Sequence, residues 1–358
     1  MRRPHSFFPQ PSNRGFTLVE MLVATAVLVL LIVLVAQLTN SATMTITSSR
    51  KHLDADAQAR LIFDRMGNDF ANMLKRKDVD YILKTGTNPQ NNHPSLDEQM
   101  LDGGNSPYYG NDAMYFFSEA PAYSGTNSNA ATRNSVALVG YRINTANPYA
   151  LNTPVLERLG KTLTWDQAPP TGMVFLTGTA GTIAPPAGSK STYGNWGATV
   201  GDATSNYSNG TDADFHVLGD SVYRFEYTYL LKPFTASSPV TVSGSTYSAG
   251  QVVPARISNI PWDTFQNHST ISGLQDVSAI IVGLGILDSN SRKTVTNYNK
   301  LMTSLPDASG TADIMQSWKT AVSGTTGQQT NPYKANTGLN STAFSQLRYY
   351  QRYFYLNN

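Results

Sequence analysis

Residues that commonly carry out chemistry are sparse in this chain of 358 residues, and their spacing matches no catalytic or metal-binding pattern. There is no cysteine, which excludes disulfides, thiolate metal sites and cysteine nucleophiles. The histidines show neither the HExxH spacing of zinc proteases nor a triad spacing, so each is interpreted as a surface or loop residue. The chain also lacks a GxSxG elbow and a phosphate-binding loop, and "GLG" at Gly283 to Gly285 lacks the third glycine of a dinucleotide motif. We therefore predict that the protein is not an enzyme and needs no cofactor. The histidines are His5, His52, His93, His216 and His268.

Two neighbouring carboxylates, Asp212 and Asp214 in "SNGTDADF", are candidate calcium ligands. Calcium takes six to eight oxygen ligands, and the remainder of an EF-hand-like pattern is missing here. We favour a solvated turn at these residues, and a calcium site is the weaker hypothesis.

A third chemical feature is a single carboxylate, Glu20, at the front of a long apolar run. Near the interface its charge costs less than the ~3 kcal/mol of a charge at mid-bilayer, yet it is still unfavourable when alone. Ionisable groups inside membranes usually have a partner, so we look for a cation that could reach Glu20. The simpler alternative is a glutamate that extends to the lipid headgroups.

The apolar run predicts a transmembrane helix. From Phe16 to Leu38 the polar side chains are Thr17, Glu20, Thr25 and Gln37, and these 23 residues are enough to cross a bilayer core of ~30 Å at ~1.5 Å per residue. An ordinary secretory signal has a shorter apolar region and a small-residue cleavage site after it, neither of which is found here. The basic residues lie before the span, so the leader should stay cytoplasmic and the remaining chain should be exported.

Charge gives no reason to expect a nucleic-acid partner. Arg2, Arg3 and Arg14 lie in a leader without acidic residues, and without them the 26 basic side chains become 23, against 24 acidic ones. Charged residues make up only 14% of the chain, while Gly, Asn, Ser and Thr are abundant. This composition is typical of a loop-rich β structure.

The leader, the glycine, the glutamate and the span together form a recognisable signature. "GFTLVE", Gly15 to Glu20, resembles the class III signal of type IV prepilins and pseudopilins. The resemblance implies that a prepilin peptidase cuts between Gly15 and Phe16 and methylates the new amino terminus at Phe16. It also implies that Glu20, the fifth residue of the mature chain, pairs with the Phe16 amine of a neighbouring subunit. An ordinary signal anchor is the alternative interpretation.

The helix should continue well past the membrane, because neither proline nor glycine occurs between Phe16 and Met66. We predict one helix from Phe16 to about Lys77, ~90 Å long, with its likeliest bend in the Ser- and Thr-rich residues 41–49 and a weak point at Gly67. Two apolar stripes are expected to face a globular domain: Leu53, Ala57 and Leu61, and next to them Ile62, Met66, Phe70 and Met73 or Leu74. Charged pairs at i,i+4 should lie on the other surfaces, and three cations should follow at the carboxyl end. The expected pairs are Asp56 with Arg60, Arg60 with Asp64, and Arg65 with Asp69; the cations are Lys75, Arg76 and Lys77.

The remaining chain predicts an antiparallel β domain with long loops. In "SVYRFEYTYL", Ser221 to Leu230, aromatic residues alternate with Arg224, Glu226 and Thr228. This alternation predicts a strand of an antiparallel sheet that is packed on one side, its aromatic face, rather than a sugar-binding or protein-binding platform. The more apolar stretch Val277 to Leu287 should be a central strand. The aromatic carboxyl terminus should dock onto the core as a helix or a strand. Further strands are expected at 113–118, 135–144 and 155–165, short helices at 293–305 and 311–322, and surface loops at 178–210 and 233–250.

The globular part also has a looser likeness to J-class minor pseudopilins of type II secretion, in "RLIFDRMGNDFANML", "VALVGYRIN", "PVLERLGKTLTWD" and "VLGDSVYRFEYTYL". Its large size and aromatic ending are also similar to the Verru_Chthon cassette proteins, whose role is unknown. Residues 280–358 correspond less well to either group.

We therefore predict an α+β, pilin-like protein with a leader at 1–15, a transmembrane half-helix at 16–38, a soluble half-helix at 39–80 and a β-rich domain at 81–358. Its expected function is that of a non-enzymatic minor subunit of a type IV pilus-like or type II secretion-like filament. The expected partners are the prepilin peptidase, other pilin or pseudopilin subunits and the bacterial inner membrane, with the carboxyl-terminal domain in the periplasm or outside the cell. The rival hypothesis is a surface binding module or hydrolase that uses the span only as a tether.

Overall fold

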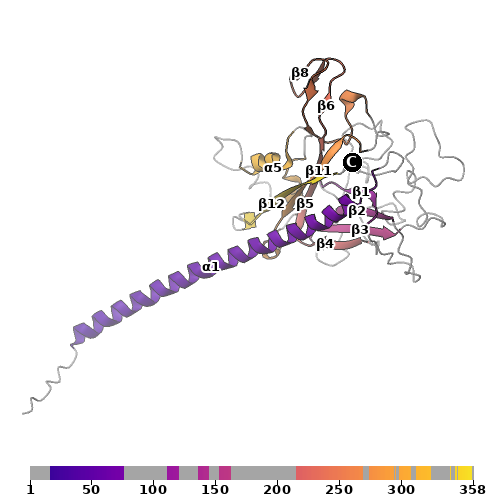
Figure 1. Ribbon diagram of the computed structural model, residues 1–358. Helices are drawn as coiled ribbons and strands as arrows, with labels where there is room; N and C mark the ends of the chain where they lie inside the picture. The colour runs from indigo at the N-terminus through magenta and orange to yellow at the C-terminus, as the bar shows by residue number, and fades with distance from the viewer. Residues whose placement is uncertain are drawn as a thin grey trace, which may run out of the picture. The chain divides into compact units, whose positions relative to one another are not determined.

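The computed structural model divides the chain into two compact units, Met1–Lys51 and His52–Asn358 (Figure 1). The predicted loop at 178–210 lies outside the described residues. These are 17–75, 111–120, 136–144, 153–162, 215–268, 274–293, 295, 298–307, 312–323, 339, 343–344 and 346–356.

Helix α1, Leu18–Ala71, contributes residues to both units. It passes through the Ser- and Thr-rich segment, where threonine hydroxyls donate to backbone carbonyls four residues earlier, as Thr43 does to Thr39 and Thr47 does to Thr43, each at 2.8 Å. Such bonds compete only weakly with the helix, so the segment stays helical, and the bend expected there remains a prediction.

The helix ends six residues before the predicted Lys77. Met73 forms an isolated antiparallel bridge with Ser118, and the backbone N–H of Leu74 donates to the carbonyl of Phe117 at 2.8 Å. The chain therefore leaves the helix to pair with a strand, and Lys75 does not lie at the helix end. Arg76 and Lys77 lie outside the described residues.

One of the two predicted apolar stripes is confirmed and the other is wrong. The stripe at Ile62, Met66, Phe70 and Met73 is buried in the main core. The other stripe faces away from the domain, with Leu53 65% and Leu61 58% exposed and Ala57 also exposed. Periodicity identifies both stripes but cannot say which one the domain covers, and here Ala55 and Ala59 extend the buried stripe instead.

The predicted i,i+4 pairs were also partly wrong. Asp69 lies 3.8 Å from Arg65 but is fully buried rather than on an outer surface. Asp56 and Asp64 bond to the carboxyl-terminal strand, as described below, because tertiary contacts outcompete the weak pairs along a helix.

The first sheet has four antiparallel strands in the order β1-β2-β3-β4. They are β1 (Met114–Ser118), β2 (Ala137–Asn144), β3 (Val155–Thr162) and β4 (Phe215–Gly219). The first three confirm the predicted strands at those positions. Gly219 lets this sheet approach the helix closely, because a Cβ there would lie 2.8 Å from Ile62 Cδ1.

The second sheet has the order β10-β5-β11-β12. Its strands are β5 (Val222–Leu231), β10 (Arg256–Ser258), β11 (Val277–Ile286) and β12 (Arg348–Tyr355). The prediction that residues 277–287 form a central strand is confirmed, since β11 pairs with β5 on one side and β12 on the other.

Strand β5 has an aromatic face, but the opposite face is buried as well, which corrects the prediction of a sheet covered on one side only. Phe225 and Tyr227 lie opposite Leu284 and Val282 on the α1 side of the sheet. On the other side, Arg224 and Glu226 are fully buried and joined at 2.8 Å. Arg224 also donates to Asp307 Oδ1 at 2.5 Å, and this pairing with two carboxylates lowers the cost of burying its charge.

Helix α5 (Ile314–Ser323) packs on this second face and ends one residue beyond the predicted segment at 311–322. Two shorter helices precede it: α4 (Tyr298–Thr303) falls within the predicted segment at 293–305, and α3 (Ser289–Arg292) was not predicted. Gly283 makes room for α5, because a Cβ there would lie 2.7 Å from Ile314 Cγ2.

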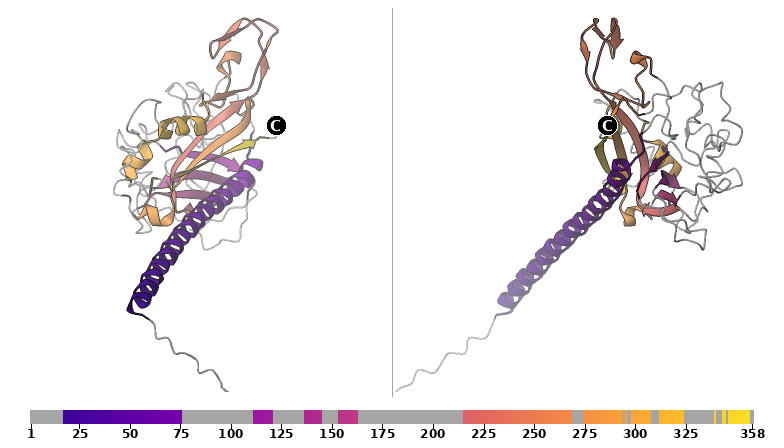
Figure 2. Two further views of the ribbon diagram at one scale, coloured as in Figure 1. Left: turned by 90° about the vertical axis from the view of Figure 1, so that its left-hand side faces the viewer. Right: turned by 45° about the vertical axis from the view of Figure 1, so that its right-hand side comes forward.

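The segment predicted as a loop at 233–250 is instead a small β arm, which extends beyond the ends of β5 and β11 (Figures 1 and 2). Its two-stranded sheets pair β6 (Phe234–Thr235) with β9 (Val252–Val253) and β7 (Val240–Val242) with β8 (Ser245–Tyr247). The sequence is rich in Ser, Thr and Gly, yet Ala236, Val242 and Val253 form a separate small core. Ser243 and Gly244 both have positive φ, as a tight hairpin turn requires.

The aromatic carboxyl terminus docks as predicted, and it is a strand. The even-numbered side chains of β12 lie along α1: Tyr350 donates to Asp56 at 2.6 Å and Arg352 to Asp64 at 2.7 Å. Phe354 packs edge-on against Phe70 with ring centroids 5.0 Å apart. The odd-numbered side chains face α5. The last strand therefore joins the helix to the sheet.

Candidate assembly site at the amino terminus

Helix α1 begins with a closed ring of hydrogen bonds between Thr17 and Glu20. The Thr17 backbone N–H and hydroxyl both donate to Glu20 Oε2, at 2.8 and 3.0 Å. In return the Glu20 backbone N–H donates to Thr17 Oγ1 at 3.3 Å. This is a capping box, in which the residue before the helix and the third helical residue satisfy each other's donors.

The capping box changes the interpretation of Glu20. Its carboxylate is bonded within its own chain and lies at the helix amino terminus, where the macrodipole favours a negative charge. Only Oε2 takes part in these bonds, so Oε1 stays available for a further donor. The T-x-x-E spacing of Thr17 and Glu20 could have predicted this arrangement, but Thr17 was missed as a functional residue.

The sequence that contains this site matches a known family model. Residues 10–36 match the prokaryotic N-terminal methylation motif. The chain carries a class III prepilin signal. Comparison with curated proteins gives no significant match.

The signal supports a type IV pilin-like or pseudopilin-like protein, and the fold agrees. A long amino-terminal helix followed by an antiparallel β-sheet domain is the pilin-like α+β architecture. Gly15 and Phe16, the predicted cleavage and methylation residues, lie outside the described residues.

The first part of α1 has the surface of a membrane anchor. Within the described part of the chain, α1 is the helix that is long and apolar enough to span a membrane. Its large apolar side chains between Leu18 and Ile46 are all exposed, none less than 48%. A helix that is apolar on every side needs lipid or other helices around it. These properties are consistent with a membrane-anchored, single-pass protein.

The second unit adds a shorter apolar surface on the same helix. Leu53, Ala57 and Leu61 lie four residues apart, so their side chains form one continuous stripe. We call these three residues the outer stripe. These side chains point away from the domain. The domain therefore does not cover them, contrary to the prediction from the sequence.

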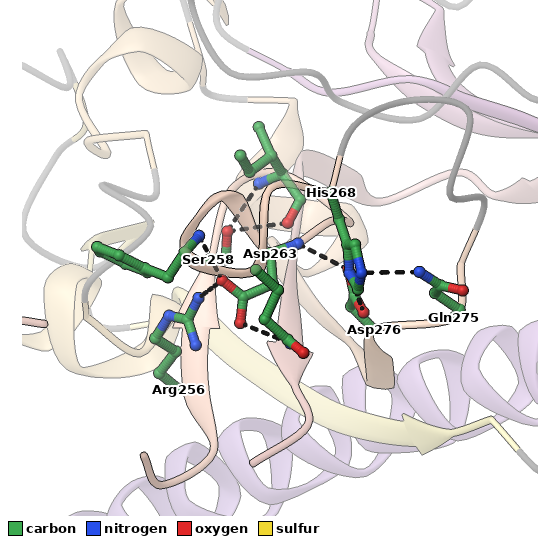
Figure 3. Close-up of polar contacts among 9 residues, drawn as sticks. Arg256, Ser258, Asp263, His268, Gln275 and Asp276 are labelled. Carbon is green, nitrogen blue, oxygen red and sulfur yellow. Dashed lines mark hydrogen bonds and ion pairs between the residues drawn. The ribbon is translucent and has the colours of Figure 1, made fainter. Parts of the chain in front are cut away.

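A polar cluster at the base of the β arm brings together Arg256, Asp263, His268 and Asp276 (Figure 3). Asp263 lies at its centre, bonded to the Arg256 guanidinium and capping the 3-10 helix η1 (Thr264–Gln266) through the Phe265 N–H at 2.9 Å. The Asp263 N–H in turn donates to Asp276 Oδ2 at 2.8 Å. These bonds connect the end of the arm to the start of β11.

The cluster contains a histidine paired with a carboxylate, yet its geometry is not that of a catalytic triad. His268 Nδ1 lies 2.8 Å from Asp276 Oδ2, while the nearby Ser258 hydroxyl donates to the Ile260 carbonyl at 2.8 Å rather than to the imidazole (Figure 3). Among the described residues there is no group of three side chains that could hold a metal ion. We interpret the cluster as the support of the arm. Asp212 and Asp214, the candidate calcium ligands, lie outside the described residues.

Proposed function

We propose that the protein is a non-enzymatic minor subunit of a type IV pilus-like or type II secretion-like filament. A prepilin peptidase cuts after Gly15 and methylates Phe16, and the mature chain enters the filament through its apolar helix. The observation that carries the proposal is the match of residues 10–36 to the methylation motif. Before assembly the helix is held in the inner membrane, with the β domain on the far side from the cytoplasm.

Glu20 has two successive roles in this proposal. The capping box holds its carboxylate at the first turn of the helix, four residues from Phe16. Cleavage then frees the Phe16 amine, and the amine of a neighbouring subunit binds Glu20 Oε1. A carboxylate can accept several hydrogen bonds, so the intersubunit ion pair and the cap are compatible. The pairing sets each new subunit in register.

The outer stripe gives assembly a second contact. In the filament we expect Leu53, Ala57 and Leu61 to pack against the helix of another subunit, which removes two exposed leucines from water. Fully burying a leucine contributes about 1.5–3 kcal/mol, so even partial cover makes this stripe a useful contact.

Four substitutions test the site, with processing and filament incorporation measured separately. Gly15→Ala should leave an unprocessed precursor. Glu20→Ala should be cleaved but poorly incorporated. Glu20→Gln retains the cap, since glutamine also serves in a capping box, but loses the charge. Thr17→Val loses the hydroxyl of the cap but retains the Glu20 charge.

The outcome of this series separates the two roles of Glu20. If the ion pair drives assembly, Glu20→Gln is as defective as Glu20→Ala, and Thr17→Val is milder than both. Normal incorporation of Glu20→Gln would exclude the ion pair, and normal processing of Gly15→Ala would exclude the cleavage assignment. For the outer stripe, Leu61→Gln should reduce incorporation without changing the melting temperature. The exposed neighbour change Arg60→Gln is its control.

A further inference from the structure

The buried stripe of α1 contains a fully buried carboxylate, Asp69. Arg158 on β3 approaches it with a two-pronged contact, Nε to Oδ2 at 2.6 Å and Nη2 to Oδ1 at 2.8 Å. The Tyr141 hydroxyl on β2 donates to the same Oδ2. Arg65 lies further out, 3.8 Å from Oδ2 and 38% exposed. The Asp69 carboxyl group is therefore held in the core by donors from two strands of the first sheet.

The Tyr141 hydroxyl keeps the proton that it donates to Asp69. Burial and the neighbouring negative charge of Asp69 raise the pKa of the Tyr141 phenol well above its usual value. The phenol therefore stays protonated, and its proton is available to the Asp69 carboxylate.

Apolar contacts alone would fix the helix poorly along its axis. They are non-directional, and the buried stripe repeats every three or four residues. A slide by one turn would put Ala55 in place of Ala59, Ile62 in place of Met66 and Met66 in place of Phe70. Each exchange brings one apolar side chain to the position of another.

The charged position does not permit the same slide. Moving the helix by one turn in one direction brings Arg65 to the place of Asp69, opposite Arg158, so that two cations meet in the core. Moving it in the other direction takes Asp69 away and leaves the Arg158 guanidinium and the Tyr141 hydroxyl without their acceptor. A buried charge without its partner is strongly unfavourable, whereas the correct pair is close to neutral against an apolar replacement.

We propose that Asp69, Arg158 and Tyr141 form a register lock, which holds α1 at one position along the first sheet and contributes specificity more than stability. The lock itself rests only on contacts within the second unit. The role of the lock in assembly rests on the proposed function. If the domain is fixed at the same position along α1 in every subunit, all subunits present identical surfaces when their helices pack.

The test measures the position of the helix directly. The chain has no cysteine, so spin labels can be placed at Ala57→Cys on α1 and Thr320→Cys on α5, both exposed positions. The full-length protein in detergent micelles gives one narrow distance distribution by pulsed electron resonance. Replacing the lock by apolar residues, Asp69→Leu with Arg158→Met and Tyr141→Phe, should leave a cooperative thermal transition but broaden or split that distribution, with a shift of about one helical turn, ~5.4 Å.

The exposed ion pair between the same helix and β12 is the matched control. Asp64→Leu with Arg352→Met removes a contact whose side chains are 60% and 45% exposed, and the distribution should stay narrow. An unchanged distribution in the lock variant would overturn the proposal. If that variant does not fold, Arg158→Lys decides, because lysine retains the charge but loses the two-pronged geometry. A broadened distribution then supports the lock and an unchanged one refutes it. Filament formation is not needed for this measurement, so its failure and that of the proposed function are distinguishable.

Discussion

Both parts of α1 are helical, but they differ in how far the protein itself covers their apolar side chains. From Leu18 to Arg50 apolar side chains surround the helix and all of them are exposed. From His52 to Ala71 the domain covers one stripe, while polar residues and the outer stripe remain outside. Among the described residues of the first unit nothing covers this part of α1, which therefore needs lipid or other helices around it, whereas the domain in the same chain covers the second part.

The strongest test of the second part removes its contact with the carboxyl-terminal strand. Phe354 is only 6% exposed and packs against Phe63 and Phe70, so Phe354→Ala should lower the free energy of unfolding by about 3–5 kcal/mol. Tyr355, the next residue, is 68% exposed and serves as control, with an expected change within about 0.5 kcal/mol. Denaturant titration of both variants measures the difference. Equal losses of unfolding free energy in the two variants would mean that the β12 side chains facing α1 do not stabilise the packing of the helix.

The same substitution in both parts of the helix contrasts their surroundings. Leu30→Asp places a charge in the apolar span and should cost insertion about 3 kcal/mol, which lowers the fraction that resists alkaline extraction from membranes. Leu61→Asp, in the outer stripe, should leave extraction unchanged and alter unfolding by no more than about 0.5 kcal/mol. A domain destabilised by Leu61→Asp would show that the outer stripe is covered within the chain after all.

The contacts that β12 makes with Asp313, next to α5, predict that stability depends on pH. Burial raises the pKa of Asp313, but hydrogen bonds from Tyr353, Gln351 and two backbone N–H groups outweigh it and hold the pKa below its ordinary value of 3.8. A lowered carboxyl pKa stabilises the folded state above the unfolded pKa, and this contribution is lost as pH falls through the folded value. Melting temperatures below pH 4 should therefore decline less steeply in Asp313→Asn than in the parent protein. If the melting temperatures of the two proteins decline equally below pH 4, Asp313 contributes nothing to this pH dependence.

The smallest expected effect is a gain in stability. Gly67 lies inside α1, and an added Cβ would be 3.6 Å from Phe354 Cε1, an ordinary contact. Gly67→Ala should therefore stabilise the helix by about 0.5–1 kcal/mol. Gly283→Ala is the opposing control, because its Cβ would lie 2.7 Å from Ile314 Cγ2 and should destabilise. Thermal unfolding measures both, and a loss of stability in Gly67→Ala would show that the helix needs this glycine.

Most of the architecture could be predicted because it depends on local patterns. The absence of proline and glycine between Phe16 and Met66 predicted α1, and alternation or continuous apolar runs predicted β5 and β11. The errors arose where distant contacts decide. The end of α1 is set by pairing of Met73 with Ser118, and the orientation of Leu53 and Leu61 is set by which stripe the sheets cover.

Composition misled in the β arm, where Ser, Thr and Gly indicated a loop. A few inward residues, such as Val242 and Val253, are enough to close a hairpin core, and the polar residues occupy its exposed side. In the candidate site, Glu20 could be predicted from its position in the apolar run. The buried role of Asp69 could not, because its partners Arg158 and Tyr141 lie far away in the sequence.

The central claim, that the chain is processed as a prepilin, is tested most directly by mass spectrometry of the amino-terminal peptide of the protein purified from its native membrane. The account predicts a mature chain that begins at Phe16 with one methyl group on its amine. A chain that retains Met1 and the leader through Gly15 would contradict it and would favour a protein that uses the span only as a tether.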